Sequence, residues 1–311
     1  MDGLVVRSTG SWYSVQTEDG NTYECKLKGR FKIKGIRTTN PIAVGDYVSF
    51  EWKDDKKIGL IHTIKERKNY IIRKSVNLSK KSHIIAANID QAILVVTLAN
   101  PRTSTGFIDR FLITTEAYHI PAILVFNKID LYDETLQQAK DELKNIYSNL
   151  GYPCIDVSAK EAINLEELKS VMHNKISLFS GHSGVGKSAL INALDPSKNI
   201  RVGDLSEAHA KGVHTTTFAE MHALDFGAYI IDSPGIKEFG LIDFEKQELS
   251  HYFPEMAACL QGCKFNNCTH EHEPECAIIE AVRSGEIAFS RYENYIKILH
   301  GDEIGLEDYK N

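Results

Sequence analysis

The sequence predicts three structural parts: an N-terminal OB-like β-barrel, a central α/β domain with a doubly wound, mostly parallel sheet, and a mainly helical C-terminal domain. Short runs of alternating polar and apolar residues, separated by glycines, fill about residues 3–67 and are typical of a small Greek-key barrel. Apolar runs then alternate with helical patterns, which predicts a parallel sheet, and an acidic stretch with a Cys/His cluster follows. The expected bounds are 1–68, 69–238 and 239–311.

Composition indicates a globular protein with a sizeable core, because 42% of the 311 residues are apolar and 25% are charged. The longest apolar stretch, residues 92–99, is far shorter than the roughly 18 residues that span a bilayer. Residues 1–15 lack the basic-then-apolar pattern of a signal peptide. We therefore expect a cytoplasmic protein with no membrane partner and no disulfide framework among its six cysteines, and nothing in the sequence requires more than a monomer.

Charge is distributed unevenly along the chain, whose net charge is −6. Residues 1–81 contain 17 basic and 9 acidic residues, whereas residues 241–311 contain 6 and 14. A basic N-terminal module on an acidic protein indicates a local polyanion-binding face, although solvated lysines on a small β-domain explain the charge equally well.

The barrel is expected from five short runs, at residues 12–15, 22–25, 31–33, 46–52 and 58–61. Basic residues alternate with apolar ones over residues 26–37, so a period of two places the charges on one face and the apolar side chains in the core. OB-like barrels with a basic face bind oligonucleotides, and an SH3-like barrel that binds protein is the alternative. A basic connector, residues 65–81, leads to the next domain.

The central domain is expected from apolar runs of the buried-strand type at residues 89–98, 122–126, 154–157, 176–179 and 228–231. Helical patterns lie between them at about residues 106–118, 134–150 and 165–172. The last helix is preceded by an Asn-x-x-Glu capping signature, Asn164 and Glu167.

The run Gly181-His182-Ser183-Gly184-Val185-Gly186-Lys187-Ser188 lies between an expected strand and an expected helix, as a phosphate-binding loop does. Its glycines let the backbone N–H groups wrap around an anion, and the helix N-terminus adds positive potential. Lys187 is expected to span the β- and γ-phosphates, and the Ser188 hydroxyl to bind Mg²⁺.

The run Asn127-Lys128-Ile129-Asp130 indicates guanine as the base. A carboxylate at Asp130 can accept hydrogen bonds from guanine N1–H and the 2-amino group, which adenine cannot match. Asn127 is expected to brace the pocket, the Lys128 stem to pack over the base, and the Ala159 N–H of Ser158-Ala159-Lys160 to meet guanine O6. Because these elements precede the phosphate loop in the chain, the domain is expected to be a circularly permuted P-loop GTPase.

The run Asp232-Ser233-Pro234-Gly235 ends the last apolar strand. Asp232 is expected to hold Mg²⁺ through water, and the Gly235 N–H to meet the γ-phosphate. A threonine after Gly212 and Val213 is expected to complete the Mg²⁺ coordination, as in GTPase switches that order on binding. Thr216 is favoured over Thr215, and an exposed strand is the alternative for this run.

The spacing Cys263-x4-Cys268-x-His270-x5-Cys276 places three thiolates and one imidazole within 14 residues. This set suits one structural, tetrahedral Zn²⁺ per chain, with no open position for catalysis. Cys259 and His272 remain possible substitutes, and chance clustering of reduced cysteines is the alternative.

A barrel, a permuted GTPase and a Cys-x4-Cys-x-His-x5-Cys segment together closely resemble the bacterial ribosome small-subunit-dependent GTPase A family, RsgA, over nearly the whole chain. The resemblance implies an OB-fold N-terminal domain, GTP hydrolysis stimulated by the small ribosomal subunit, and late small-subunit maturation with rRNA contact. One departure is Val213 before His214, where the family pattern has arginine.

Ile236 occupies the position at which many small GTPases carry a water-orienting glutamine, so slow intrinsic hydrolysis is expected. Our hypothesis is that rRNA docking orders residues 214–217 and brings His214 to the attacking water; contact with RNA or simple packing are its alternatives. The chain then leaves the switch toward the Cys/His segment, so GTP and GDP are expected to orient that segment differently and to control ribosome binding and release.

Two other functions are compatible with parts of the pattern. An RNA-binding assembly protein could hold GTP as a structural ligand without useful turnover. A P-loop kinase or ATPase is the second alternative, against which Asp130 argues.

Overall fold

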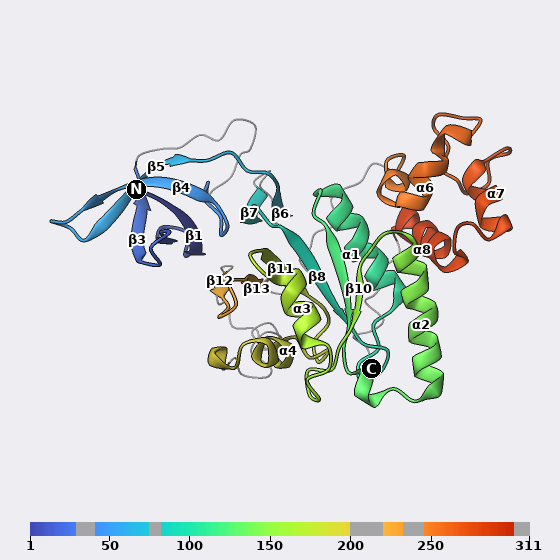
Figure 1. Ribbon diagram of the computed structural model, residues 1–311. Helices are drawn as coiled ribbons and strands as arrows, with labels where there is room; N and C mark the ends of the chain where they lie inside the picture. The colour runs from blue at the N-terminus through green and yellow to red at the C-terminus, as the bar shows by residue number, and fades with distance from the viewer. Residues whose placement is uncertain (29–40, 75–81, 200–219, 233–245, 302–311) are drawn as a thin grey trace.

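The computed structural model describes residues 1–28, 41–74, 82–199, 220–232 and 246–301 (Figure 1). Its N-terminal part is a ring of five strands: β1 (Asp2–Ser8), β2 (Tyr13–Gln16), β3 (Thr22–Leu27), β4 (Tyr47–Lys53) and β5 (Ile58–Ile64). They pair in the order β1–β2–β3–β5–β4–β1, in which β3 and β5 are parallel and the other pairs antiparallel. The ring confirms the predicted OB-like barrel; the expected run at 31–33 lies outside the described residues.

The barrel core follows from the period of two along its strands. Val5, Tyr13, Val15 and Cys25 point inward and are buried, while their neighbours along the strands are more exposed. Burial raises the pKa of Cys25 to about 12, so this residue is a neutral core thiol at neutral pH.

The stretch expected to be a connector contains a strand. β6 (Tyr70–Lys74) pairs antiparallel with β7 (Ser82–Ala87) in a two-stranded hairpin. Ile71 and Ala86 are buried in the core of the central domain. The prediction of a connector is wrong here because the basic residues of this stretch obscured the apolar ones that a strand places on its inner face.

A buried ion pair holds the segment between β5 and β6 against the barrel. Arg67 Nε and Nη2 donate to the two carboxylate oxygens of Asp46, each at 2.6 Å, and Nη2 also donates to Pro41 O at 2.8 Å. The side chains are 9% and 0% exposed. The Ala43 N–H donates to Asp46 Oδ2 at 2.8 Å, so the carboxylate is well satisfied.

The central sheet has the strand order β10–β9–β8–β11–β13–β12. The strands are β8 (Gln91–Val96), β9 (Ala122–Phe126), β10 (Cys154–Asp156), β11 (Ile176–Ser180), β12 (Glu220–Ala223) and β13 (Tyr229–Asp232). The pairs are parallel except that β12 runs antiparallel to β13. Every residue of β8, β9 and β11 is buried, as expected for strands covered on both faces.

The sheet confirms the circular permutation. Strand β11 leads into the phosphate loop and lies at the centre of the sheet, between β8 and β13, although β8, β9 and β10 all precede it in the chain. Strand β12 was not among the expected runs, because Met221 is the one buried residue of its four. Arg7 of β1 pairs with Glu220 of β12, so the barrel meets this edge of the sheet.

The helices begin and end within one residue of the expected positions: α1 (Thr105–Ala117), α2 (Glu134–Asn149) and α3 (Leu165–Met172), with α4 (Lys187–Leu194) after the phosphate loop. The expected cap at Asn164 is wrong. Its backbone is left-handed, with φ 55°, its side chain makes no capping hydrogen bond, and its amide donates instead to Asp156 O at 2.8 Å. The asparagine therefore satisfies the end of β10 and not the helix N-terminus.

The C-terminal part is mainly helical, as predicted, and lies against α1 (Figure 1). Its elements are η4 (Leu249–Tyr252), α6 (Pro254–Cys259), η5 (Leu260–Gly262), α7 (Ala277–Ser284) and α8 (Phe289–His300). Phe253, Met256, Tyr295 and Leu299 form its core together with Ile113 of α1. Among the described residues, no helix has the length and apolarity that crossing a bilayer requires.

Replacing Arg67 by methionine should lower the unfolding free energy of the barrel by about 3–5 kcal/mol, because Asp46 would stay buried without its cation. Urea unfolding followed by tryptophan fluorescence measures this effect, since both tryptophans, Trp12 and Trp52, belong to the barrel.

The matched control is Lys65→Met, which removes the exposed ion pair with Asp2 and should leave the unfolding midpoint nearly unchanged. Equal midpoints for Arg67→Met and the wild type would show that the buried pair contributes no net stability.

Candidate nucleotide and metal sites

Three loops meet at the carboxyl edge of the central sheet. The phosphate loop follows β11, the loop 127–130 follows β9, and the loop 158–160 follows β10. Parallel strands have their carboxyl ends at the same edge of a sheet. In open α/β sheets, ligands bind at this edge, at the point where the strand order reverses. Strands β9 and β10, which carry the loops 127–130 and 158–160, lie on the same side of β11, and β8 lies between β9 and β11.

The phosphate loop requires glycine at its two ends. Gly181 has φ 145° and Gly186 has φ 97°, values that favour glycine. A Cβ at Gly186 would lie 2.5 Å from Asn127 Nδ2, and one at Gly181 would lie 2.6 Å from Val95 O. The close packing of this loop against its neighbours therefore depends on the two missing side chains.

The Lys187 ammonium group lies over the loop that it belongs to. Its Nζ donates to the carbonyl oxygens of Gly181 and His182, each at 2.7 Å. Ser188 is buried in the first turn of α4, whose N-terminus faces the loop. Both residues sit where the sequence predicts, with the positive end of a helix beside them.

The side chain of Asn127 holds two of the loops together. Its Nδ2 donates to Val185 O at 2.9 Å, and its Oδ1 accepts from the Ala159 N–H at 3.2 Å. The predicted bracing role of Asn127 thus has a geometric basis. The Ala159 N–H, expected to meet guanine O6, here donates to Asn127.

Asp130 and Ser158 form a pair within the predicted base pocket. Ser158 Oγ donates to Asp130 Oδ1 at 2.6 Å and accepts from the Glu161 N–H at 3.0 Å. Lys128 donates to Gly184 O at 2.7 Å, and burial lowers its pKa while Asp130 acts to raise it. Lys160 is exposed to solvent.

Sequence reasoning missed Tyr132 and the loop 97–103. The Tyr132 hydroxyl donates to Asn127 O at 2.9 Å and accepts from the Leu98 N–H at 3.0 Å, which ties the base loop to the end of β8. Asn100 O accepts a hydrogen bond from Lys128 Nζ. No motif marks these residues, because Leu98 and Tyr132 are 34 residues apart and Asn100 and Lys128 are 28 residues apart.

The expected switch residues are described only in part. The backbone of Asp232 ends β13 and pairs in register with Phe179, two residues before Gly181, so Asp232 lies beside the phosphate loop. His214, Thr215, Thr216 and Gly235 lie outside the described residues.

The four predicted metal ligands converge. The ligand atoms of Cys263, Cys268, His270 and Cys276 lie within 4.8 Å of one another. His270 Nδ1 is 3.4 Å from Cys276 Sγ and 3.6 Å from Cys263 Sγ, and the two sulfurs are 3.9 Å apart. Tetrahedral zinc with bonds of about 2.3 Å to sulfur and about 2.0 Å to nitrogen places its ligands at roughly such separations.

A further residue orients the histidine. His270 Nε2 lies 3.2 Å from Ser250 Oγ, and Ser250 is buried. A proton on Nε2 that is donated to this hydroxyl leaves the Nδ1 lone pair directed at the three sulfurs. The possible substitutes Cys259 and His272 are outside the converging set, and the His272 side chain is 82% exposed.

A glycine-bounded phosphate loop at the central strand, with a guanine-type loop two strands away but earlier in the chain, defines a circularly permuted P-loop GTPase. The family model described as "RsgA GTPase" matches residues 64–242, and the family model described as "RsgA N-terminal domain" matches residues 2–61. The chain belongs to the RsgA GTPase family, as its sequence motifs predict.

Relatives and solved structures agree over almost the whole chain. The small ribosomal subunit biogenesis GTPase RsgA of Flavobacterium johnsoniae is 56% identical over 305 residues, which cover 97% of this chain and 94% of that protein. The crystal structure of YjeQ from Thermotoga maritima is 40% identical with a TM-score of 0.79, covering 96% of this chain and 97% of that one. The structure of YloQ, a circularly permuted GTPase, is 29% identical with a TM-score of 0.74, covering 100% and 96%.

Substituting Gly186 by alanine should weaken guanine-nucleotide binding by at least about tenfold, since the new Cβ would lie 2.5 Å from Asn127 Nδ2 in a left-handed backbone. Titration with a fluorescent GDP analogue measures the affinity.

Gly151→Ala is the matched control for backbone strain. Gly151 has φ 89° in the same domain, and nothing lies within 4 Å of its added Cβ. It should lose some stability and keep its nucleotide affinity. Equal affinities for Gly186→Ala and the wild type would contradict the predicted role of the loop.

Proposed function

We propose that this protein binds and hydrolyses GTP during late maturation of the small ribosomal subunit, and that the subunit and its rRNA stimulate hydrolysis. The observation that carries the proposal is the convergence of the three loops held by Asn127, in a chain whose relative from Flavobacterium johnsoniae is named a small ribosomal subunit biogenesis GTPase. Bound GTP or GDP would then control association with the subunit and release from it.

GTP is proposed to lie along the carboxyl edge of the sheet. Asp130 accepts from the guanine edge, the Lys128 stem covers the base, and the Ala159 N–H turns from Asn127 to guanine O6. Residues 181–186 surround the phosphates with backbone N–H groups, and Lys187 exchanges its two carbonyl acceptors for phosphate oxygens. The hydrogen bond from Ser158 Oγ to Asp130 Oδ1, at 2.6 Å, restrains the orientation of the carboxylate.

Magnesium fits the residues present. The buried Ser188 lies in the first turn of α4, and the strand that ends at Asp232 pairs with β11, which leads into the phosphate loop. Bound there with GTP, Mg²⁺ would neutralise charge on the β- and γ-phosphates. Thr216, or Thr215 in its place, and the Gly235 N–H are proposed to complete this site.

His214 is proposed to position the attacking water once rRNA docking orders its segment. The support is chemical, because Ile236 stands where a water-orienting glutamine is common and cannot hydrogen-bond a water. A His214→Ala variant should therefore lose subunit-stimulated turnover while it keeps its GTP affinity.

One structural Zn²⁺ is proposed in the Cys/His cluster. The sulfur–sulfur and sulfur–nitrogen distances fit a tetrahedral ion, and four protein ligands leave no position for a substrate. The ion would replace the apolar packing that so short a segment cannot supply by itself.

The barrel is proposed to contact rRNA. Lys26 Nζ lies 4.0 Å from the ring centre of Trp12, which is 39% exposed, so a cation and an aromatic face lie together on the barrel surface. We further propose a cytoplasmic monomer whose domains span 1–68, 69–238 and 239–311; the family matches that end at 61 and 242 support this division.

GTP hydrolysis by the purified protein, with and without small ribosomal subunits, tests the proposed function. Turnover should be slow alone, as expected for a site without a positioned water, and should rise at least about tenfold with small subunits. Large subunits are the control and should have no effect. Equal turnover in all three conditions would refute stimulation by the subunit.

Ser250→Ala tests the zinc proposal. Loss of the hydrogen-bond acceptor for His270 Nε2 should lower the zinc affinity by about 10- to 100-fold, measured by competition with a chelator. Ser284→Ala is the control, because this hydroxyl donates to Ala281 O elsewhere in the segment. Unchanged affinity in Ser250→Ala would show that Ser250 does not orient a zinc ligand.

A further inference from the structure

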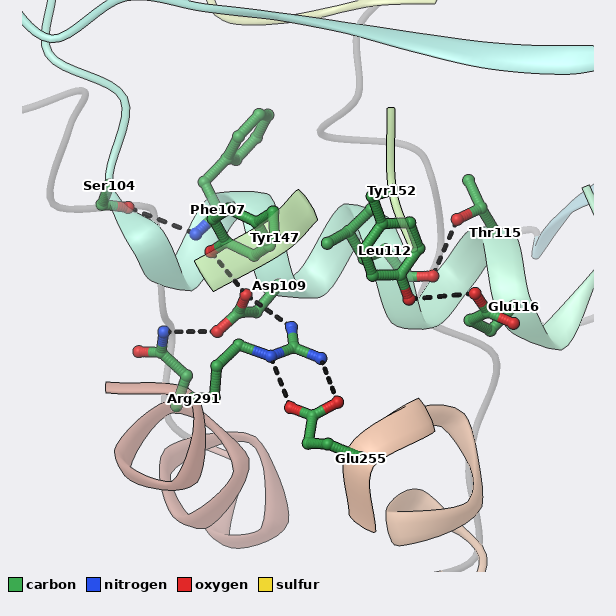
Figure 2. Close-up of polar contacts among 11 residues, drawn as sticks. Ser104, Phe107, Asp109, Leu112, Thr115, Glu116, Tyr147, Tyr152, Glu255 and Arg291 are labelled. Atoms are coloured by element: carbon green, nitrogen blue, oxygen red, sulfur yellow. Dashed lines mark hydrogen bonds and ion pairs between the residues drawn. The ribbon is translucent and has the colours of Figure 1, made fainter. Parts of the chain in front are cut away.

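We propose that helix α1 couples the nucleotide site to the C-terminal part, with Phe107 and Asp109 as positioning residues. The side chains of Phe107 and Asp109 leave α1 on opposite sides (Figure 2). Phe107 packs against His182 of the phosphate loop, and Asp109 is held by Arg291 of α8. The position of the C-terminal part thereby sets the affinity for guanine nucleotides. The proposal rests on the proposed nucleotide binding and is independent of the ribosomal role.

The first contact is between aromatic rings. The rings of Phe107 and His182 have centroids 3.8 Å apart and planes inclined by 32°, and both residues are buried. His182 is the second residue of the phosphate loop, and its carbonyl accepts from Lys187 Nζ at 2.7 Å. A shift of α1 would therefore move the loop that has to receive the phosphates.

The residues that lead into α1 also contact the nucleotide loops. Asn100 O accepts from Lys128 Nζ, and Pro101 Cδ lies 3.3 Å from the position of a Cβ at Gly184. The loop 97–103, which precedes α1, is closed by the Thr103 N–H, which donates to Thr97 O at 2.7 Å. The segment that leads into α1 therefore packs against the phosphate loop at Gly184 and is hydrogen-bonded to the base loop at Lys128.

The other side of α1 carries a buried charge that belongs to the C-terminal part. Asp109 Oδ1 accepts from Arg291 Nη1 at 2.6 Å, and Asp109 Oδ2 accepts from Asn294 Nδ2 at 2.6 Å. Arg291 also donates to Glu255 from Nε at 2.7 Å and from Nη2 at 3.1 Å. The side chains of Asp109, Arg291 and Glu255 are 0%, 1% and 7% exposed.

These charges make the contact rigid. Burial lowers the pKa of Arg291, but Asp109 and Glu255 outweigh it and raise the pKa, so the guanidinium stays charged. Separating a buried pair leaves an uncompensated charge, which is strongly unfavourable. Helix α8 therefore cannot slide along α1 without breaking the network, and the two helices move together.

The consequence is a reciprocal coupling. If the C-terminal part steadies α1 and α1 steadies His182, a change at either end alters the free energy of the other by the same amount. This route uses Phe107 and Asp109, two residues apart in one helix, and does not involve the switch residues 214–217 or 233–235.

The decisive variants are Asn294→Ala and Tyr147→Phe. Each removes one hydrogen bond to the carboxylate of Asp109, from Asn294 at 2.6 Å or from the Tyr147 hydroxyl at 2.7 Å. Asn294 belongs to α8, whereas Tyr147 belongs to α2 of the central domain, so Tyr147→Phe is the matched control. Both keep the ion pair, which makes them milder than Arg291→Met.

Affinity for a fluorescent GDP analogue is then measured for the full-length variants. Phe107→Leu should weaken binding by about tenfold and Asn294→Ala by about threefold, whereas Tyr147→Phe should leave it unchanged. In the double variant Phe107→Leu/Asn294→Ala, the loss of affinity should stay near tenfold. The aromatic contact that would transmit the effect of Asn294→Ala to the phosphate loop is already absent in this variant. Reciprocally, GDP should slow amide hydrogen exchange in α8 of the wild type but not of Phe107→Leu.

Several results would overturn the coupling. Multiplicative losses in the double variant would mean that the two sites act independently, and equal losses in Asn294→Ala and Tyr147→Phe would assign the effect to the burial of Asp109 alone. Unchanged exchange in α8 of the wild type on adding GDP would also refute it. A wild type that binds no guanine nucleotide would refute the proposed function itself.

Discussion

The nucleotide site depends on one amide side chain, that of Asn127. It donates to the phosphate loop at Val185 O and accepts from the next loop at Ala159 N, while Gly186 leaves it room to pass. An amide can donate and accept at once, whereas a carboxylate can only accept and an aliphatic group can do neither. Three loops from three strands are therefore held in one arrangement.

The permutation leaves this arrangement intact because loop positions follow strand order in space and not order along the chain. Strand β11 is central in the sheet whether β8, β9 and β10 come before or after it. What changes is the attachment of the flanking parts. The chain enters the sheet from the barrel through the hairpin β6–β7, and the helical C-terminal part returns to pack on α1.

The buried ion pairs at the contact between α1 and the C-terminal part, formed by Asp109, Arg291 and Glu255, explain why the C-terminal part packs on α1 in one orientation. Burying Asp109 and Arg291 opposes folding unless each polar atom has a partner, and here Asn294, Tyr147 and Glu255 supply them. An apolar contact of similar area would tolerate sliding, whereas a network of directed hydrogen bonds does not. The charged contact therefore gives the two parts a defined relative position at some expense in stability.

The sequence by itself determined the barrel, the α/β class, the permuted order of motifs and the Cys/His set, because glycine spacing, apolar periods and clustered ligands are local properties of the chain. It did not reveal strands β6 and β12, where charge or short length obscured the pattern. Nor did it reveal the partner of Asn164, whose amide donates to the end of β10 and does not cap α3. Only the tertiary structure decided that Asn127 meets Val185, that Phe107 meets His182 and that Asp109 meets Arg291, 182 residues away. Such partners are selected by how helices and loops pack in three dimensions, and no local pattern in the sequence records that choice.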